Sequence, residues 1–113
     1  MTGTSMDGLD ICVSKIKFFL KSINVEVIKV GYVEFPKKIK LNIENSLSLK
    51  KEDIKTCHKS LGEFMAKETH QFIKKNKISN IDAVGMHGQT IEHISGVKSL
   101  QIGDPKYLLN KLN

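Results

Sequence analysis

The sequence contains no arginine and no tryptophan, and aromatic residues make up only 6% of its 113 residues. All 18 basic residues are therefore lysines, and against 12 acidic residues they give a formal net charge of +6. A nucleic-acid-binding surface normally uses arginine for bidentate contacts and aromatic rings for base stacking. The basic charge thus indicates solvated lysine-rich faces, and we expect no nucleic-acid partner.

Cysteine and long apolar runs are also scarce. Cys12 and Cys57 lie far apart, and the four histidines do not complete a zinc-binding spacing with them. We therefore expect free thiols and no metal-ligand set. No apolar run approaches the length of a membrane span, and the start lacks the basic and then apolar order of a signal peptide. These absences predict a cytoplasmic protein that has no membrane partner.

The sequence does contain a polar turn near its start, at residues 2–10 with the sequence TGTSMDGLD. Its glycines free the backbone, so that several N–H groups can converge on an anion such as a phosphate. Thr4 and Ser5 add hydroxyl donors. The carboxylates of Asp7 and Asp10 suit the water shell of a metal ion or a sugar hydroxyl.

The spacing of Gly3 and Gly8 is that of the first part of a P-loop. However, Leu9 and Asp10 stand where that motif requires Lys and Ser or Thr, so a P-loop is excluded. The residues alone leave two alternatives open, an ordinary tight turn and a phosphate-binding turn.

Alternating apolar residues predict two antiparallel strands after this turn, at residues 9–18 and 25–35, joined by a turn at 19–22. The alternation slips phase near Val27 and Ile28, which predicts a β-bulge.

Two helices are predicted next. Apolar residues recur every four positions in residues 37–47, and three- and four-residue steps continue through residues 48–76. Gly62 in the second helix would allow close helix packing. The following polar side chains of that helix are expected to be solvated: His58, Glu63, Glu68 and His70.

The apolar run at residues 78–86 predicts a buried strand that ends at residues 87–90, His-Gly-Gln-Thr. Ligands gather at the carboxyl ends of such strands, and Gln89 and Thr90 can each bond hydroxyl groups or an N-acetyl amide. For His87 a structural role, as a cap or a buried histidine, and a catalytic role both stay open.

Residues 99–105, Ser-Leu-Gln-Ile-Gly-Asp-Pro, predict a short strand around Leu100 and Ile102. Asp104 is then the expected N-cap, and Pro105 the first residue, of a last helix.

Three of these segments, residues 2–10, 87–90 and 99–105, resemble the anhydro-N-acetylmuramic acid kinases, which belong to the sugar kinase, heat-shock protein 70 and actin superfamily. They occur in the order found in that family. The resemblance implies an α/β fold, namely part of an actin-like ATPase (ribonuclease H-like) domain with a mixed sheet flanked by helices. Residues 1–113 would form a single partial N-terminal domain of a two-domain sugar kinase, from which the first strand and the second domain are missing.

The resemblance also implies an activity. Family enzymes use ATP and Mg²⁺ to open the 1,6-anhydro ring with water and to phosphorylate O6, a step in cell-wall recycling. By motif match the ATP phosphates would lie on Gly3, Thr4, Ser5, Met6, Asp7, Gly8, Leu9 and Asp10. The anhydro amino sugar would contact Ser5, Asp7, Gln89 and Thr90.

No residue matches the catalytic aspartate of the family, which is expected beyond Asn113, so we expect the chain alone to be inactive. A partner polypeptide that carries the rest of the kinase is then expected. The alternative is a non-catalytic interaction or ligand-binding remnant that self-associates through its exposed sheet edge.

Overall fold

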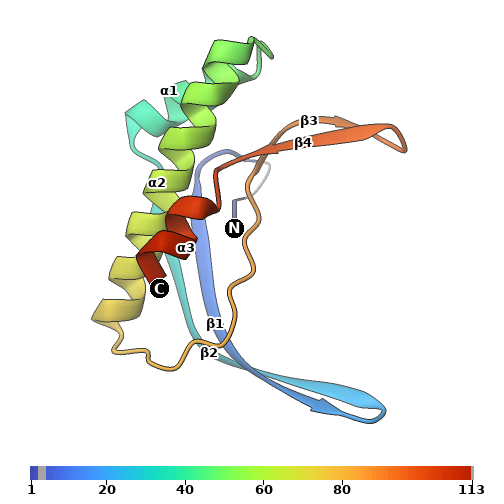
Figure 1. The fold of residues 1–113 in the computed structure, drawn as a ribbon, viewed down its shortest axis with the longest axis vertical. Coiled ribbons are helices and arrows are strands. Elements are labelled where there is room, and N and C mark those ends of the chain that lie inside the picture. Colours follow the sequence, from blue (N-terminus) through green and yellow to red (C-terminus); the bar gives the residue numbers. More distant parts are fainter. Residues whose placement is uncertain (3–4, 113) are drawn as a thin grey trace.

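The computed structural model describes residues 1–2 and 5–112 (Figure 1). The elements are β1 (Gly8–Phe19), β2 (Ser22–Glu34), α1 (Lys37–Ser46), α2 (Lys51–Lys75), β3 (Gln89–Ile94), β4 (Lys98–Ile102) and α3 (Lys106–Leu112). Strand β1 pairs antiparallel with β2, and β3 with β4, as two separate two-stranded sheets. The α/β class is confirmed, but the described residues form two hairpins and not one mixed sheet.

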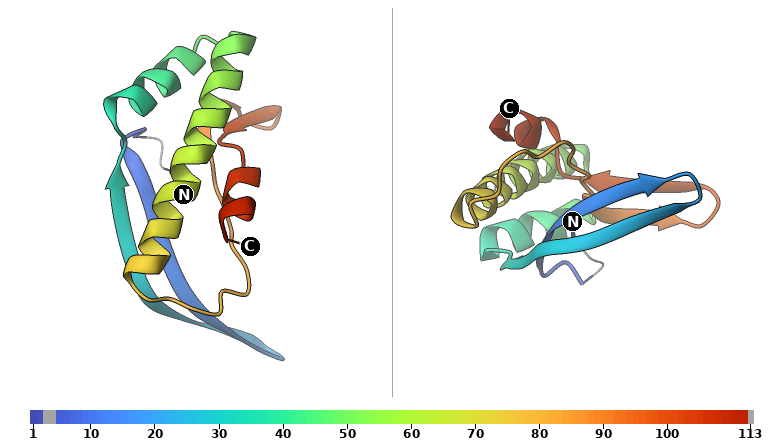
Figure 2. Two further views of the ribbon diagram at one scale, coloured as in Figure 1. Left: turned by 60° about the vertical axis from the view of Figure 1, so that its left-hand side comes forward. Right: turned by 90° about the horizontal axis from the view of Figure 1, so that it is seen from below.

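The hairpin of β1 and β2 follows the predicted pattern. Val13 pairs with Lys29 and Ser14 with Val27, so Ile28 is an extra residue on β2 and the predicted bulge is confirmed. A bulge increases the local twist and bends the ribbon. Beyond it the hairpin runs away from the helices as a projecting arm, which we define as residues 14–28 (Figures 1 and 2).

Helix α2 is the central element of the fold. Figure 2 shows it as a middle layer, with α3 on one side and α1 and the base of the first hairpin on the other. Both α1 and α2 are confirmed close to their predicted bounds. The buried core is made of Leu9, Ile11, Phe35, Ile39, Ile43, Cys57, Leu61, Met65, Ile91 and Ile102.

The prediction of a buried strand at residues 78–86 is wrong. Residues 78–88 form no strand, and Ser79 to Gly85 are exposed. They form an extended connection between α2 and β3 (Figure 1). An apolar run becomes a buried strand only where neighbouring strands satisfy its backbone groups on both sides, and no described residue pairs with this segment. The apolar side chains can be read from the sequence, but whether a partner strand lies beside them cannot.

The end of the chain follows the predicted order of strand, cap and helix. The Lys106 N–H donates to Asp104 Oδ1 at 3.0 Å, and the Leu109 N–H donates to the carbonyl of Pro105 at 3.1 Å. The N-terminal Asp cap is therefore confirmed. The bond from the Lys106 N–H is also the main reason why the pKa of Asp104 lies below its ordinary value. Strand β3, in contrast, was not predicted.

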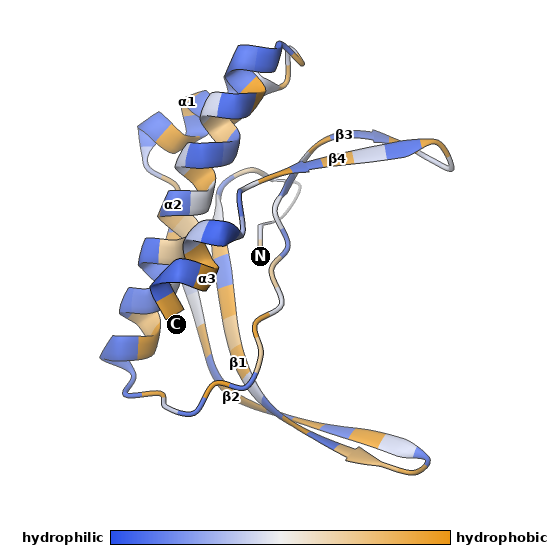
Figure 3. Cartoon of the chain, viewed as in Figure 1, coloured by the Kyte–Doolittle hydropathy of each residue, from blue (hydrophilic) through white to orange (hydrophobic). Residues whose placement is uncertain are grey.

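The molecule is more extended than its length requires. Its radius of gyration is 15.5 Å, whereas a compact chain of this length has about 13 Å. Figure 3 shows apolar bands along the projecting arm. The exposed apolar residues of this arm are Ile16, Phe18, Phe19, Leu20, Ile23, Val25, Val27 and Ile28. Within residues 1–2 and 5–112, no helix is both long and apolar enough to cross a bilayer.

The packing of α1 on α2 generates a stability prediction. Ile43 is fully buried, whereas Leu41 on the same helix is 55% exposed. We expect Ile43→Ala to lower the free energy of unfolding by about 2–5 kcal/mol, because it leaves a cavity in the core. The matched control Leu41→Ala should change it by less than about 0.5 kcal/mol. Urea unfolding followed by circular dichroism measures both, and equal losses would contradict the described packing.

Candidate functional site

The polar turn at the start of the chain presents a hydroxyl and a carboxylate to solvent. Ser5 Oγ donates to Asp7 Oδ1 at 2.6 Å, and the Phe35 N–H donates to the carbonyl of Asp7 at 2.9 Å. The Ser5 hydroxyl is the largest cause of a lowered pKa at Asp7, and the N–H groups of Asp7 and Gly8 add to it. Asp7 is therefore ionised at neutral pH. Gly3 and Thr4 lie outside the described residues.

Two side chains of the turn point into the core. Leu9 is 1% exposed, and Met6, whose φ of 56° is unusual for a residue other than glycine, packs against the same core. Leu9 therefore offers a ligand only its backbone groups. The side chain of Asp10, in contrast, is exposed, and its N–H donates to the carbonyl of Met1 at 2.8 Å.

A tyrosine on β2 covers the turn from the side. A Cβ built on Gly8 would lie 2.5 Å from the ring of Tyr32, so a side chain at position 8 would push this exposed ring aside. Burial raises the pKa of Tyr32, and the nearby carboxylates of Asp7 and Glu34 raise it further. Lys40 on α1 forms an ion pair with Glu34 at 2.9 Å. Sequence analysis missed the contact of Tyr32 with Gly8, because this contact results from the register of β1 and β2.

The second predicted segment lies at the start of β3. Gln89 is 1% exposed and its side-chain amide donates to the carbonyl of Thr90 at 3.3 Å. Thr90 is half-buried. His87 is exposed, which excludes a role as a buried histidine. Its Nε2 lies 2.8 Å from the side-chain nitrogen of Gln101. The bulge between Thr90 and Glu92 bends the strand just beyond the segment.

The two segments share one hydrophobic core. Met6 and Leu9 from the turn pack in the same cluster as Ile91 of β3 and Ile102 of β4. The fold therefore holds both of them against a common support, although they are about eighty residues apart in the sequence.

The chemistry of the turn fits a magnesium nucleotide. Mg²⁺ prefers carboxylate oxygens and usually keeps several of its waters, and the exposed carboxylates of Asp7 and Asp10 offer such ligands. Thr2 Oγ1 is buried and has no hydrogen-bond partner among the described residues, so the turn retains an unused polar group. In the described part of the chain, no three His, Cys, Asp or Glu side chains gather as a metal cage.

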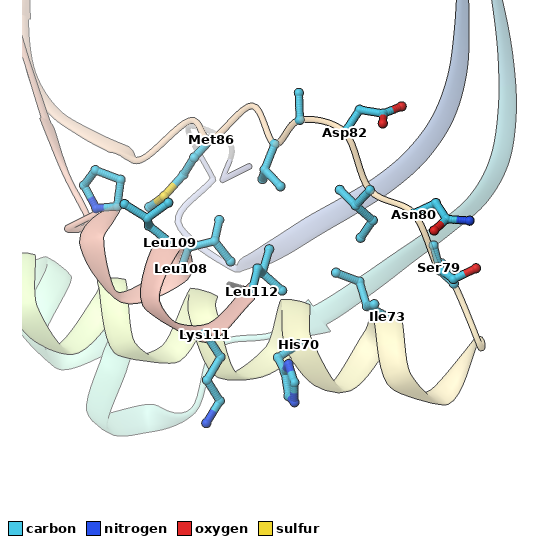
Figure 4. Close-up of a pocket in the computed structure, with 15 residues that line it drawn as sticks. His70, Ile73, Ser79, Asn80, Asp82, Met86, Leu108, Leu109, Lys111 and Leu112 are labelled. Carbon is cyan, nitrogen blue, oxygen red and sulfur yellow. The ribbon is translucent and has the colours of Figure 1, made fainter.

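A separate hollow lies away from the polar turn. It has a volume of about 740 Å³ and is bounded by the end of α2, the connection to β3 and α3. Figure 4 shows Leu108, Leu112 and Ile73 facing it, while Asp82 points away. None of the turn residues that the structure describes lines it. We interpret this hollow as core that the unpaired connection leaves uncovered, and not as the functional site.

Comparison with known proteins assigns the chain to a group. The family model described as anhydro-N-acetylmuramic acid kinase matches residues 1–113. The anhydro-N-acetylmuramic acid kinase of Bacillus cereus (strain ATCC 10987) is 32% identical over 126 residues, which cover 100% of this chain and 32% of that protein.

Two further kinases of the same name agree with this match. The protein from Caldanaerobacter subterraneus is 32% identical over 98% of this chain, and the protein from Bacillus anthracis (strain CDC 684) is 30% identical over 100% of it. In each case 32% of the relative is covered. The chain thus spans about a third of the length of the curated relatives it matches.

The bond between Ser5 and Asp7 generates a prediction about protonation. Ser5→Ala removes the largest cause of the lowered Asp7 pKa, so we expect this pKa to rise toward its ordinary value of 3.8. A lowered folded-state pKa gives stability that is present above 3.8 and is lost as the pH falls through the folded-state pKa, so the variant should lose this contribution. NMR titration of the Asp7 carboxyl carbon measures the shift.

Ser14→Ala is the matched control, because the Ser14 hydroxyl contacts Cys12 Sγ at 3.4 Å and makes no contact with Asp7 among the described bonds. An Asp7 titration that is the same in Ser5→Ala as in the unaltered protein would contradict the described turn.

Proposed function

Because this chain belongs to the anhydro-N-acetylmuramic acid kinase family, we propose that it is the N-terminal part of an ATP-dependent kinase for 1,6-anhydro-N-acetylmuramic acid. In the proposed reaction water adds to C1, the bond from C1 to O6 breaks, O6 receives the γ-phosphoryl group of ATP, and ADP and a proton are released. The observation that supports this function best is the family match over the whole chain. The exposed hydroxyl and carboxylate of the polar turn agree with it.

In this proposal the turn handles the phosphates. Its backbone N–H groups donate to phosphate oxygens, and the Ser5 hydroxyl exchanges its bond to Asp7 Oδ1 for one to a phosphate oxygen, while Asp7 accepts from the magnesium water shell or from a sugar hydroxyl. The lowered pKa keeps Asp7 anionic in this role. Lys40, whose charge is close enough to lower the Asp7 pKa slightly, adds a cation beside the turn. Magnesium ATP, when bound, supplies the phosphoryl group.

Gln89 and Thr90 would hold the sugar in different ways. The half-buried Thr90 presents a hydroxyl that can both donate to and accept from sugar hydroxyls or an N-acetyl amide. The buried Gln89 supports this end of β3 from the core side, and its backbone pairs with Ile102. Sugar recognition therefore needs the second hairpin in its described position.

Phosphoryl transfer depends on positioning both reactants and on stabilising charge within a closed site. The family's catalytic aspartate has no match in this chain. We therefore expect the 113-residue chain alone to form no phosphorylated product from the anhydro sugar, ATP and Mg²⁺. Mass spectrometry of the reaction mixture measures this. The Bacillus cereus relative is the positive control, and product above a no-protein blank would contradict the prediction.

Nucleotide binding tests the proposal directly. On addition of Mg·ATP we expect the amide signals of residues 5–8 to shift in ¹H–¹⁵N NMR spectra. We expect Asp7→Asn to weaken binding about tenfold or more, because it removes the anionic oxygen that favours the metal ion.

Asp82→Asn is the matched control, since Asp82 is exposed on the connection before β3 and points away from the hollow (Figure 4). Shifts confined to other residues, or equal binding by both variants, would contradict a nucleotide site at the turn.

A specific observation also favours a second candidate function, a non-catalytic interaction module that self-associates. The projecting arm exposes apolar side chains such as Phe18 and Leu20, and unpaired strand edges with such side chains promote association. A molecular mass that rises with concentration in sedimentation equilibrium, together with no response to Mg·ATP, would favour this candidate over the kinase.

A further inference from the structure

A histidine on α2 contacts the turn that joins β4 to α3. The Gly103 N–H donates to His58 Nδ1 at 3.1 Å, and the Asp104 N–H donates to the His58 carbonyl at 2.9 Å. His58 is half-buried, so the prediction that its side chain is solvated is wrong. One residue thus accepts two consecutive N–H groups from a segment 45 residues further along the chain.

The turn between β4 and α3 lies directly against α2. Gly103 has a φ of +118°, a conformation that glycine adopts readily and that residues with a Cβ rarely adopt. The backbone of Asp104 also lies directly on Gly62 of α2, where an added Cβ would come within 2.6 Å of the Asp104 carbonyl oxygen. The predicted close packing at Gly62 is thereby confirmed. Two bonds and one close contact fix the turn to α2.

The position of the Gly103 turn determines where the sugar-binding candidates Gln89 and Thr90 lie. Ile102, the residue before Gly103, pairs with Gln89, and its carbonyl lies so close to Gly88 that no Cβ fits there. The neighbouring Gln101 pairs with Thr90. The side-chain Nε2 of Gln101 also lies 2.8 Å from His87 Nε2. Strand β4 therefore transmits the position of the turn to residues 87–90.

The bond also defines the protonation of the histidine. The Gly103 N–H is a donor, so Nδ1 of His58 must be the acceptor and carry no proton, which places the ring proton on Nε2. Lys51, Lys55 and Gln101 line the same hollow as His58, and the Asp104 carboxylate is close enough to interact with the charge of the histidine. A side chain without an acceptor at the Nδ1 position would leave the Gly103 N–H unpaired.

We propose that His58 is a positioning residue for the sugar-binding segment, and that it acts by accepting the Gly103 N–H at Nδ1 and so holding β4 against α2. It acts through β4 and does not touch the sugar. The part of this proposal that concerns the anhydro amino sugar rests on the proposed function. The part that concerns the geometry of residues 87–90 does not.

The test compares three replacements of His58 in the purified protein. His58→Asn keeps an acceptor near the Nδ1 position, His58→Gln places its oxygen near the Nε2 position, and His58→Leu has no acceptor. We expect hydrogen exchange of the Gly103 amide to accelerate about tenfold or more in His58→Leu and His58→Gln, and about threefold or less in His58→Asn. The amide signals of Gln89 and Thr90 should shift in the same two variants.

The tautomer and a matched variant add independent controls. The ¹⁵N signal of His58 should show an unprotonated Nδ1. His70→Leu, twelve residues further along the same helix and so about 18 Å from His58, should leave the exchange of Gly103 and the signals of Gln89 and Thr90 unchanged. If His58→Leu does not fold, the difference between His58→Asn and His58→Gln decides the result.

Binding of 1,6-anhydro-N-acetylmuramic acid separates the two proposals. We expect the dissociation constant to rise about tenfold in His58→Gln and to be largely restored in His58→Asn. If the unaltered protein binds no sugar, the proposed function fails, while the exchange and shift data still decide the role of His58. A Gly103 amide equally protected in all three variants, or a proton on Nδ1, would overturn the positioning role.

Discussion

The buried apolar side of α2 is the constraint on which the rest of the structure depends. An isolated helix is marginally stable in water, and the lysine-rich outer face of α2 adds no core contacts, so the helix needs tertiary packing. Cys57, Leu61 and Met65 provide it and are almost fully buried. Burial raises the pKa of Cys57 to about 11, so its thiol stays protonated and packs as a small apolar group. The hairpins and the other helices are arranged around this side.

The same helix connects the two halves of the candidate site. Its apolar side packs in one cluster with Leu9 of the polar turn and with Ile91 and Ile102 of the second hairpin. Its polar side reaches the Gly103 turn through His58. A single rigid element thus determines the position of the phosphate-binding candidates and of the sugar-binding candidates, which makes the site sensitive to substitutions far from any ligand.

Features that depend on neighbouring residues in the chain were predictable from the sequence. The bulge at Ile28, the two long helices and the Asp104 cap each follow from a local pattern, and the structure confirms them. Features that depend on strand register or on distant partners were not. The ring of Tyr32 over Gly8 depends on cross-strand register, and the contact of His58 with Gly103 joins residues 45 apart. A histidine on a lysine-rich helix gives no local sign of such a partner.

The error at residues 78–86 and the exposed arm have one physical origin. Apolar side chains such as Phe18, Leu20 and Val84 are exposed, although burying them would release about 25 cal/mol for each Å² of apolar surface. The sequence shows which side chains are apolar. Their burial requires a partner surface, however, and the described residues do not provide one. The relatives are about three times as long as this chain, and under the proposed function their remaining length would cover these surfaces. The strand prediction was therefore wrong because the described residues supply no partner strand for this apolar run.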